Sequence, residues 1–180
     1  KAAEKPEPNN QTVSDGVAEA LFSLGFAIQN QDPYQAIIFS RLAIYLRPSF
    51  TIAKLLLAGS LEDNDKLKEA NNIYHSMSKD PNYSWATRLR IASNLDGLGK
   101  TDDAIRNLRA MALEKIERSD ALIRLGDILQ RHKRYQASIN AYEQAKKRIQ
   151  GVNNKHWPLY FSLGISYERI RKWPMAEKNL

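Results

Sequence analysis

The residue types that most often do chemistry in proteins are few in this chain and poorly placed for it. None of the three histidines, His75, His132 and His156, has a cysteine, a second histidine or a carboxylate at the spacing of metal ligands. The acidic stretch 63–65 faintly resembles a calcium loop, but Leu67 stands where such a loop needs an oxygen ligand. The sequence therefore predicts no metal site.

Patterns for covalent or nucleotide-dependent catalysis are also missing from the sequence. The absence of cysteine excludes disulfides and thiolate nucleophiles. There is no Gly-rich phosphate loop, no His-Glu-x-x-His and no Gly-x-Ser-x-Gly pattern. We therefore expect no cofactor and no enzymatic activity in this stretch.

The composition is that of an ordinary globular protein with a basic surface. With 43% hydrophobic and 26% charged residues the chain is typical of globular proteins. It contains no apolar run of about 18 residues, so the sequence predicts no membrane span. The formal net charge of +7 favours acidic partners, although it also fits a merely basic surface. The basic runs 131–134 and 146–148 stand near predicted helix ends, where the helix dipole favours cations, so nucleic acid is not the expected partner.

The stretch 160–180 shows how the side chains must be positioned, because its apolar residues recur every three or four positions. That spacing places them on one face of a helix, and Pro174 divides the stretch where a helix tolerates proline, in its first turn. We predict a helix, a tight turn and a second helix, with Gly164 and Ala176 where the two helices come close. The residues of the pattern are Tyr160, Leu163, Gly164, Tyr167, Trp173, Ala176 and Leu180.

The same pattern recurs upstream at a nearly constant interval. Small residues precede Gly164 at successive intervals of 38, 34, 34 and 33 residues, and the polar loop 150–154 accounts for the longest. We call these positions the small slot: Gly25, Ala58, Ala92, Gly126 and Gly164. In the second helix of each earlier repeat, the position equivalent to Ala176 also holds a small residue: Ala36, Ala70, Ala104 and Ser138. The position four residues later holds Tyr74, Leu108, Tyr142 and Leu180, with Ser40 as the poor match.

These residues resemble the signature of the tetratricopeptide (TPR) repeat, whose period is about 34 residues. The resemblance covers residues 15–180 and implies an all-α fold, a right-handed α-solenoid of about five helix-turn-helix repeats. The expected repeats, after a flexible lead-in at 1–14, are 15–48, 50–81, 83–117, 119–150 and a truncated 154–180. The segments 157–169 and 173–177 also resemble long bacterial TPR-repeat proteins, some of them exported.

The resemblance implies a protein-interaction scaffold or adaptor that binds a peptide or partner segment in a concave groove lined by the first helices. Side chains two positions before the small slot, one after it and about one and a half turns beyond it should face that groove. The expected partner-binding residues are Arg90, Ser93, Arg124, Asp127, Arg131, Ile165 and Arg169.

Arg90 and Arg124 occupy the same position in successive repeats. Because the arginine fork binds a carboxylate in two-point geometry, we expect an acidic segment as the partner. The alternative is that both arginines pair with acids of the chain itself, Arg124 with Asp127 for instance. The sequence leaves both interpretations open.

Residues with strong end preferences mark the predicted helix boundaries. Ser14 or Asp15 is expected to cap the first helix, Gly99 to end another helix and Thr101 to cap the one after it. The three tryptophans stand at predicted helix starts, and we interpret them as packing residues between repeats: Trp85, Trp157 and Trp173.

Two further roles fit the pattern. The apolar face of Trp173, Ala176 and Leu180 has nothing after it to cover it. The chain is therefore expected to continue beyond Leu180, or to self-associate through this end as a structural module. Alternatively, the array is a regulatory segment of a larger protein. The sequence is compatible with either a cytoplasmic or an exported, periplasmic location.

Overall fold

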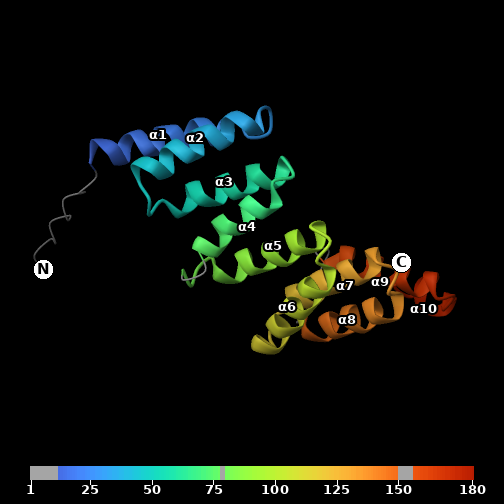
Figure 1. The fold of residues 1–180 in the computed structure, drawn as a ribbon. Helices are drawn as coiled ribbons and strands as arrows, with labels where there is room; N and C mark the ends of the chain where they lie inside the picture. Colours follow the sequence, from blue (N-terminus) through green and yellow to red (C-terminus); the bar gives the residue numbers. More distant parts are fainter. Residues whose placement is uncertain (1–11, 78–79, 150–155) are drawn as a thin grey trace, which may run out of the picture. The chain divides into compact units, whose positions relative to one another are not determined.

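The computed structural model describes residues 12–77, 80–149 and 156–180 (Figure 1). The described residues form ten helices and no strand, which confirms the predicted all-α fold. The helices group into two compact units, Lys1–Asp80 and Pro81–Leu180, which we call unit 1 and unit 2 and describe separately. Most of the expected lead-in and the loop at 150–154 lie outside the described residues.

Unit 1 consists of two helix pairs in which each helix packs against the next along the chain. A small core of Ala18, Ala43 and Ala53 joins the first three helices, and Phe22 and Phe50 pack against it. The helices are α1 (Val13–Ile28), α2 (Pro33–Leu46), α3 (Thr51–Asp63) and α4 (Leu67–Ser76).

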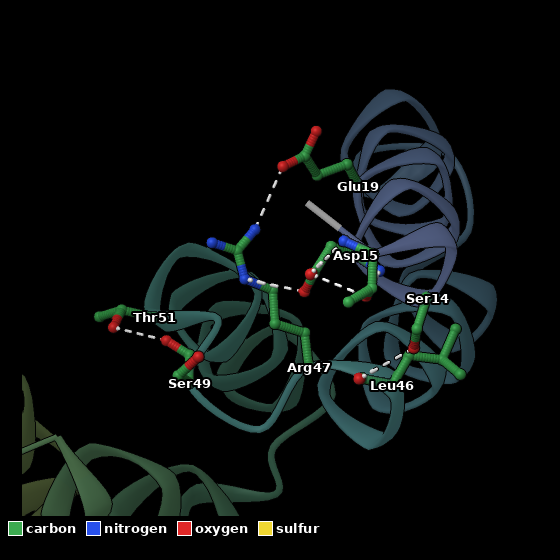
Figure 2. Close-up of polar contacts among 8 residues, drawn as sticks. Ser14, Asp15, Glu19, Leu46, Arg47, Ser49 and Thr51 are labelled. Atoms are coloured by element: carbon green, nitrogen blue, oxygen red, sulfur yellow. Dashed lines mark hydrogen bonds and ion pairs between the residues drawn. The ribbon is translucent and has the colours of Figure 1, made fainter. Parts of the chain in front are cut away.

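The start of α1 differs from the prediction, because Thr12 caps the helix instead of Ser14 or Asp15. Asp15 N donates to Thr12 Oγ1 at 3.2 Å, and Thr12 N donates to Asp15 Oδ2 at 2.9 Å. This reciprocal pair is a capping box. The Ser14 hydroxyl donates instead to Leu46 O at the end of α2, at 3.2 Å (Figure 2).

Arg47, directly after α2, ties the end of the first helix pair to its beginning (Figure 2). Its guanidinium nitrogens lie 3.6 Å from Asp15 Oδ1 and 3.1 Å from Glu19 Oε1. The same guanidinium stacks over the Phe50 ring, 5.0 Å from its centroid. Since these groups are only partly buried, the ion pairs position the chain more than they stabilise it.

Unit 2 consists of three helix pairs around a continuous apolar core, to which all six helices contribute. Leu108, Tyr142 and Leu163 in this core are fully buried. The helices are α5 (Ser84–Gly97), α6 (Thr101–Glu114), α7 (Asp120–Arg131), α8 (Tyr135–Arg148), α9 (Trp157–Arg169) and α10 (Trp173–Glu177).

The small slot lies where the two helices of a pair touch, as predicted. A Cβ added at Gly126 would lie 2.4 Å from a carbon of the Tyr142 ring. One added at Gly164 would lie 2.8 Å from the Leu180 side chain and 3.4 Å from Ala176 O. The large residue of the second helix therefore fills the space that the missing side chain leaves.

The turns inside the helix pairs explain the regular spacing. Gly99 has a φ of +76°, its N donates to Asp96 O at 2.9 Å, and Lys100 N donates to Leu95 O at 2.8 Å. This is a Schellman motif, which confirms the predicted role of Gly99. Equivalent hydrogen bonds and a positive φ recur, at intervals of 34, 34 and 38 residues, in the turns of Asp65, Gly99, Lys133 and Arg171.

Candidate partner-binding face

The seven residues expected to bind a partner lie on the three first helices of unit 2. In that unit α7 packs against both α5 and α9, so the structure brings the three helices side by side. We call the seven the first-helix residues: Arg90 and Ser93 on α5, Arg124, Asp127 and Arg131 on α7, and Ile165 and Arg169 on α9.

The arginines among the first-helix residues reach solvent, whereas the shorter side chains are partly covered. Arg90, Arg124 and Arg169 are exposed. Ser93 and Ile165 are partly buried, and the Ser93 hydroxyl donates to Leu89 O on its own helix at 3.2 Å. The charge that this surface offers a partner therefore comes from its arginines.

Asp127 does not neutralise Arg124. Its Oδ1 accepts a hydrogen bond of 2.8 Å from the Tyr142 hydroxyl of α8, and the described residues contain no ion pair between Arg124 and Asp127. Burial, together with the charge of Asp127, raises the pKa of Tyr142 well above its ordinary value. Tyr142 therefore stays protonated and holds Asp127 in a structural role.

Arg131 belongs to a polar cluster that the sequence did not reveal, centred on the buried carboxylate of Asp96. Arg131 Nη2 lies 3.2 Å from Asp96 Oδ2, and His132 Nε2 lies 2.8 Å from Asp96 Oδ1. Thr101 Oγ1 also donates to Asp96 Oδ1 at 2.8 Å, and the helix cap predicted at Thr101 is Lys100 instead. Only 4% of the Asp96 side chain is exposed, whereas 57% of the Arg131 side chain is.

The same position makes a second contact of this kind one repeat later. Gln130 stands four residues after its small slot, as Asp96 does, and its Nε2 donates to Ser162 O at 2.7 Å and to Ser166 Oγ at 2.8 Å. Asp96 thus joins α5 to the end of α7, and Gln130 joins α7 to α9. We call these two residues the tethers. The only sequence signal for the tethers was that polar side chains recur at the fourth position after the small slot.

The tryptophans divide into one packing residue and two exposed ones. Trp85 is 7% exposed, its Nε1 donates to Asp120 Oδ2 at 2.9 Å, and Arg118 stacks over its ring. Trp157 and Trp173 are 64% and 56% exposed, so their assignment as packing residues was wrong. The half-exposed ring of Phe161 lies 5.9 Å from that of Trp157, which adds an aromatic surface to α9.

The apolar end face predicted from Trp173, Ala176 and Leu180 is only partly present. Trp173 and Leu180 are exposed, but Ala176 is 2% exposed. Ala176 is covered because it lies in the contact between α9 and α10, next to Gly164. The exposed apolar surface at this position is thus smaller than the sequence suggested.

The first helices of unit 1 form an apolar trough. Its volume is about 240 Å³, and Phe22, Phe26, Ile52 and Leu55 line it together with Gln29. The rings of Phe22 and Phe26 lie 6.0 Å apart. In the part of the chain that the structure describes, no group of three histidine or acidic side chains is arranged to hold a metal ion, and no helix is long and apolar enough to cross a membrane.

Similar folds occur among solved structures, although no protein-family model and no curated protein matches the sequence. MamA from residue 41 onwards, from Desulfovibrio magneticus RS-1, is 13% identical with a TM-score of 0.67, covering 90% of each chain. A tetratricopeptide repeat protein from Parabacteroides merdae ATCC 43184 is 18% identical with a TM-score of 0.67, covering 91% of this chain and 64% of that one.

A third similar structure is YrrB, described as a TPR protein with an unusual peptide-binding site. It is 13% identical with a TM-score of 0.57, covering 90% of this chain and 82% of YrrB. At such identities the likeness establishes the fold alone, and this fold is that of TPR proteins. The resemblance inferred from the small slot is therefore confirmed at the level of the fold.

Proposed function

We propose that this chain is a protein-interaction module, a scaffold or adaptor whose first-helix residues in unit 2 bind an acidic peptide segment of a partner. The partner would add its carboxylates to Arg90 and Arg124, and Arg169 would extend the basic surface to α9. The proposal involves no catalysis, because binding requires only that the first helices present these side chains together.

The observation that supports it best is the state of Arg124 and its nearest acid. Arg124 is exposed, while Asp127 accepts its hydrogen bond from Tyr142. An exposed guanidinium next to satisfied acids gains most from an acid supplied by another molecule. YrrB and the other similar structures support a binding role in general, since they have the same fold.

The test compares two double variants that lose the same charge. Arg90→Ala/Arg124→Ala removes two cations from first helices, and Arg106→Ala/Lys147→Ala removes two exposed cations from the second helices α6 and α8. Both would serve as baits in a pull-down from a lysate of the source organism, with the unaltered chain beside them. The captured proteins would be quantified at two salt concentrations.

We expect partners whose recovery falls about tenfold with the first-helix variant and stays within about twofold with the second-helix variant, because two charge-assisted contacts are lost. Recovery should also fall as salt rises. Partners captured equally by all three baits would contradict the proposal. A circular dichroism spectrum of each bait checks that both variants fold.

A further inference from the structure

Another apolar hollow lies in unit 2, between the second helices α6 and α8 and above α7. Its volume is about 390 Å³, within the usual range of ligand-binding clefts. Leu122, Leu125 and Leu129 of α7 line it and are 2–5% exposed, so they form its floor. We call this hollow the second-helix groove.

Small residues on both sides keep the groove open. Ala112 on α6 and Ala137 and Ala141 on α8 line it, and any larger side chain at these positions would occupy the space. On α6 the apolar surface continues outwards through Leu113, which is 78% exposed. A large exposed leucine next to an apolar hollow is typical of a binding surface.

The charged groups of the groove all have the same sign. Arg109 and Arg148 line it, and none of the other described lining residues is acidic. Arg148 Nη1 donates to Ala112 O at 2.9 Å and to Arg118 O at 3.0 Å, which fixes the guanidinium at the end of α6. In the described part of the chain, Arg109 has no ion-pair partner. Arg109 is thus placed to receive a carboxylate, and Arg148, held by backbone carbonyls, adds a fixed positive charge to the same groove.

We propose that the second-helix groove binds a partner peptide that inserts a bulky apolar side chain and places a neighbouring carboxylate against Arg109 and Arg148. The apolar floor selects the inserted side chain, and the two cations select the acid. A peptide explains the exposed Leu113 better than a small molecule does, because a ligand confined to the hollow would leave that leucine in water. This site is separate from the first-helix residues.

The test is a selection of 12-residue peptides from a random phage-displayed library on the unaltered chain. The enriched peptides are then measured by fluorescence anisotropy against four variants. Arg109→Glu reverses one charge of the groove, and Ala137→Phe fills its volume. Arg106→Glu is the matched control, because Arg106 is an exposed arginine of the same helix that does not line the groove. Arg90→Ala/Arg124→Ala probes the first-helix residues.

We expect enriched peptides that combine an acidic residue with leucine or phenylalanine. Arg109→Glu and Ala137→Phe should each weaken their binding at least about tenfold, and Arg106→Glu less than about twofold. If Ala137→Phe does not fold, the pair Arg109→Glu and Arg106→Glu still decides the matter. Peptides without an acid, no enrichment, or equal losses with both glutamates would overturn the proposal. Sensitivity only to Arg90→Ala/Arg124→Ala would overturn it while supporting the first-helix site.

Discussion

Units 1 and 2 are built from the same kind of helix pair, yet their first helices expose different types of side chain. The position after the small slot holds Phe26 in α1, where the ring is 59% exposed and lines an apolar trough. The equivalent positions in α5 and α7 hold Ser93 and Asp127, next to exposed arginines. Helix stacking constrains the small slot but not its outward neighbours, so the same fold displays an aromatic ring beside the slot in α1 and polar side chains with exposed arginines beside it in α5 and α7.

The units also differ in how neighbouring repeats are joined by polar groups. In unit 2 the buried Asp96 gathers Arg131, His132 and Thr101. In unit 1 a polar link between neighbouring repeats is Arg41–Glu69, which joins the second helices α2 and α4 at 2.9 Å with about half of each side chain exposed. A polar contact shielded from water is worth more than an exposed ion pair. We therefore infer that polar contacts contribute more to stacking in unit 2.

Asp96→Ala tests this difference and should have the largest effect. The substitution removes the shared acceptor of Arg131, His132 and Thr101, and a hydrogen bond to a charged group contributes about 1.5–3 kcal/mol. We expect the free energy of unfolding of unit 2 to fall by about 3 kcal/mol. Urea unfolding followed by tryptophan fluorescence measures it, because all three tryptophans belong to unit 2.

The matched change in unit 1 is Glu69→Ala, which breaks the exposed pair with Arg41. Its expected cost is at most about 0.5 kcal/mol, measured by hydrogen exchange of the amides of α2 and α4. If Asp96→Ala costs no more than Glu69→Ala, the buried cluster does not distinguish the units.

The small slot itself gives the second comparison, Gly126→Ala against Gly25→Ala. The added Cβ at Gly126 would clash with the Tyr142 ring. That ring cannot move away, because it is fully buried and its hydroxyl donates a hydrogen bond to Asp127. At Gly25 the nearest atom is Phe39 Cβ at 3.3 Å, so a small shift relieves the contact.

Two opposing contributions set the size of these effects. Alanine favours a helix over glycine by about 1 kcal/mol, and overpacking a core costs about 1–3 kcal/mol. We expect Gly126→Ala to lower the free energy of unfolding by about 2 kcal/mol and Gly25→Ala to change it by less than about 0.5 kcal/mol. Thermal unfolding followed by circular dichroism compares the two, and equal losses would show that the slot is equally tight in both units.

The repeat architecture could be predicted because its signals are local and recur. Gly126 and Tyr142 are 16 positions apart in a pattern that returns every 34 residues or so, and each recurrence adds support to the others. The turn at Gly99 was predictable for a similar reason, since a left-handed residue after a helix favours glycine. In the turns of Lys133 and Arg171 the same conformation is imposed on residues that do not favour it, and no local signal marked them.

The candidate sites were less predictable, because they depend on contacts between distant residues. Asp96 and His132 are 36 positions apart, and neither residue is unusual in its own stretch of sequence. The second-helix groove arises from alanines on two helices whose distance is known only after folding. Trp157 illustrates the opposite error, since a large apolar residue at a helix start suggested packing but lies exposed.

The contact between the tether Gln130 and Ser166 provides the third and most specific comparison, because unit 1 has a glutamine and a serine at the equivalent positions. Gln130 donates to Ser166 Oγ in unit 2, and the equivalent pair in unit 1 is Gln29 and Ser60. Gln29 lines the apolar trough instead. The buried hydroxyl of Ser60 has no hydrogen-bond partner within the described residues. Packing, not residue type, decides whether this contact forms.

Ser60→Ala should therefore stabilise unit 1, while Ser166→Ala should destabilise unit 2. A buried hydroxyl without a partner costs about 1–3 kcal/mol, and a satisfied one contributes about 1 kcal/mol. We expect opposite changes of about 1 kcal/mol in the free energy of unfolding, by hydrogen exchange of the α3 amides in unit 1 and by tryptophan fluorescence in unit 2. If Ser60→Ala destabilises unit 1 instead, the Ser60 hydroxyl has a hydrogen-bond partner in solution. The contacts between neighbouring repeats would then be more similar in the two units than the side-chain positions indicate.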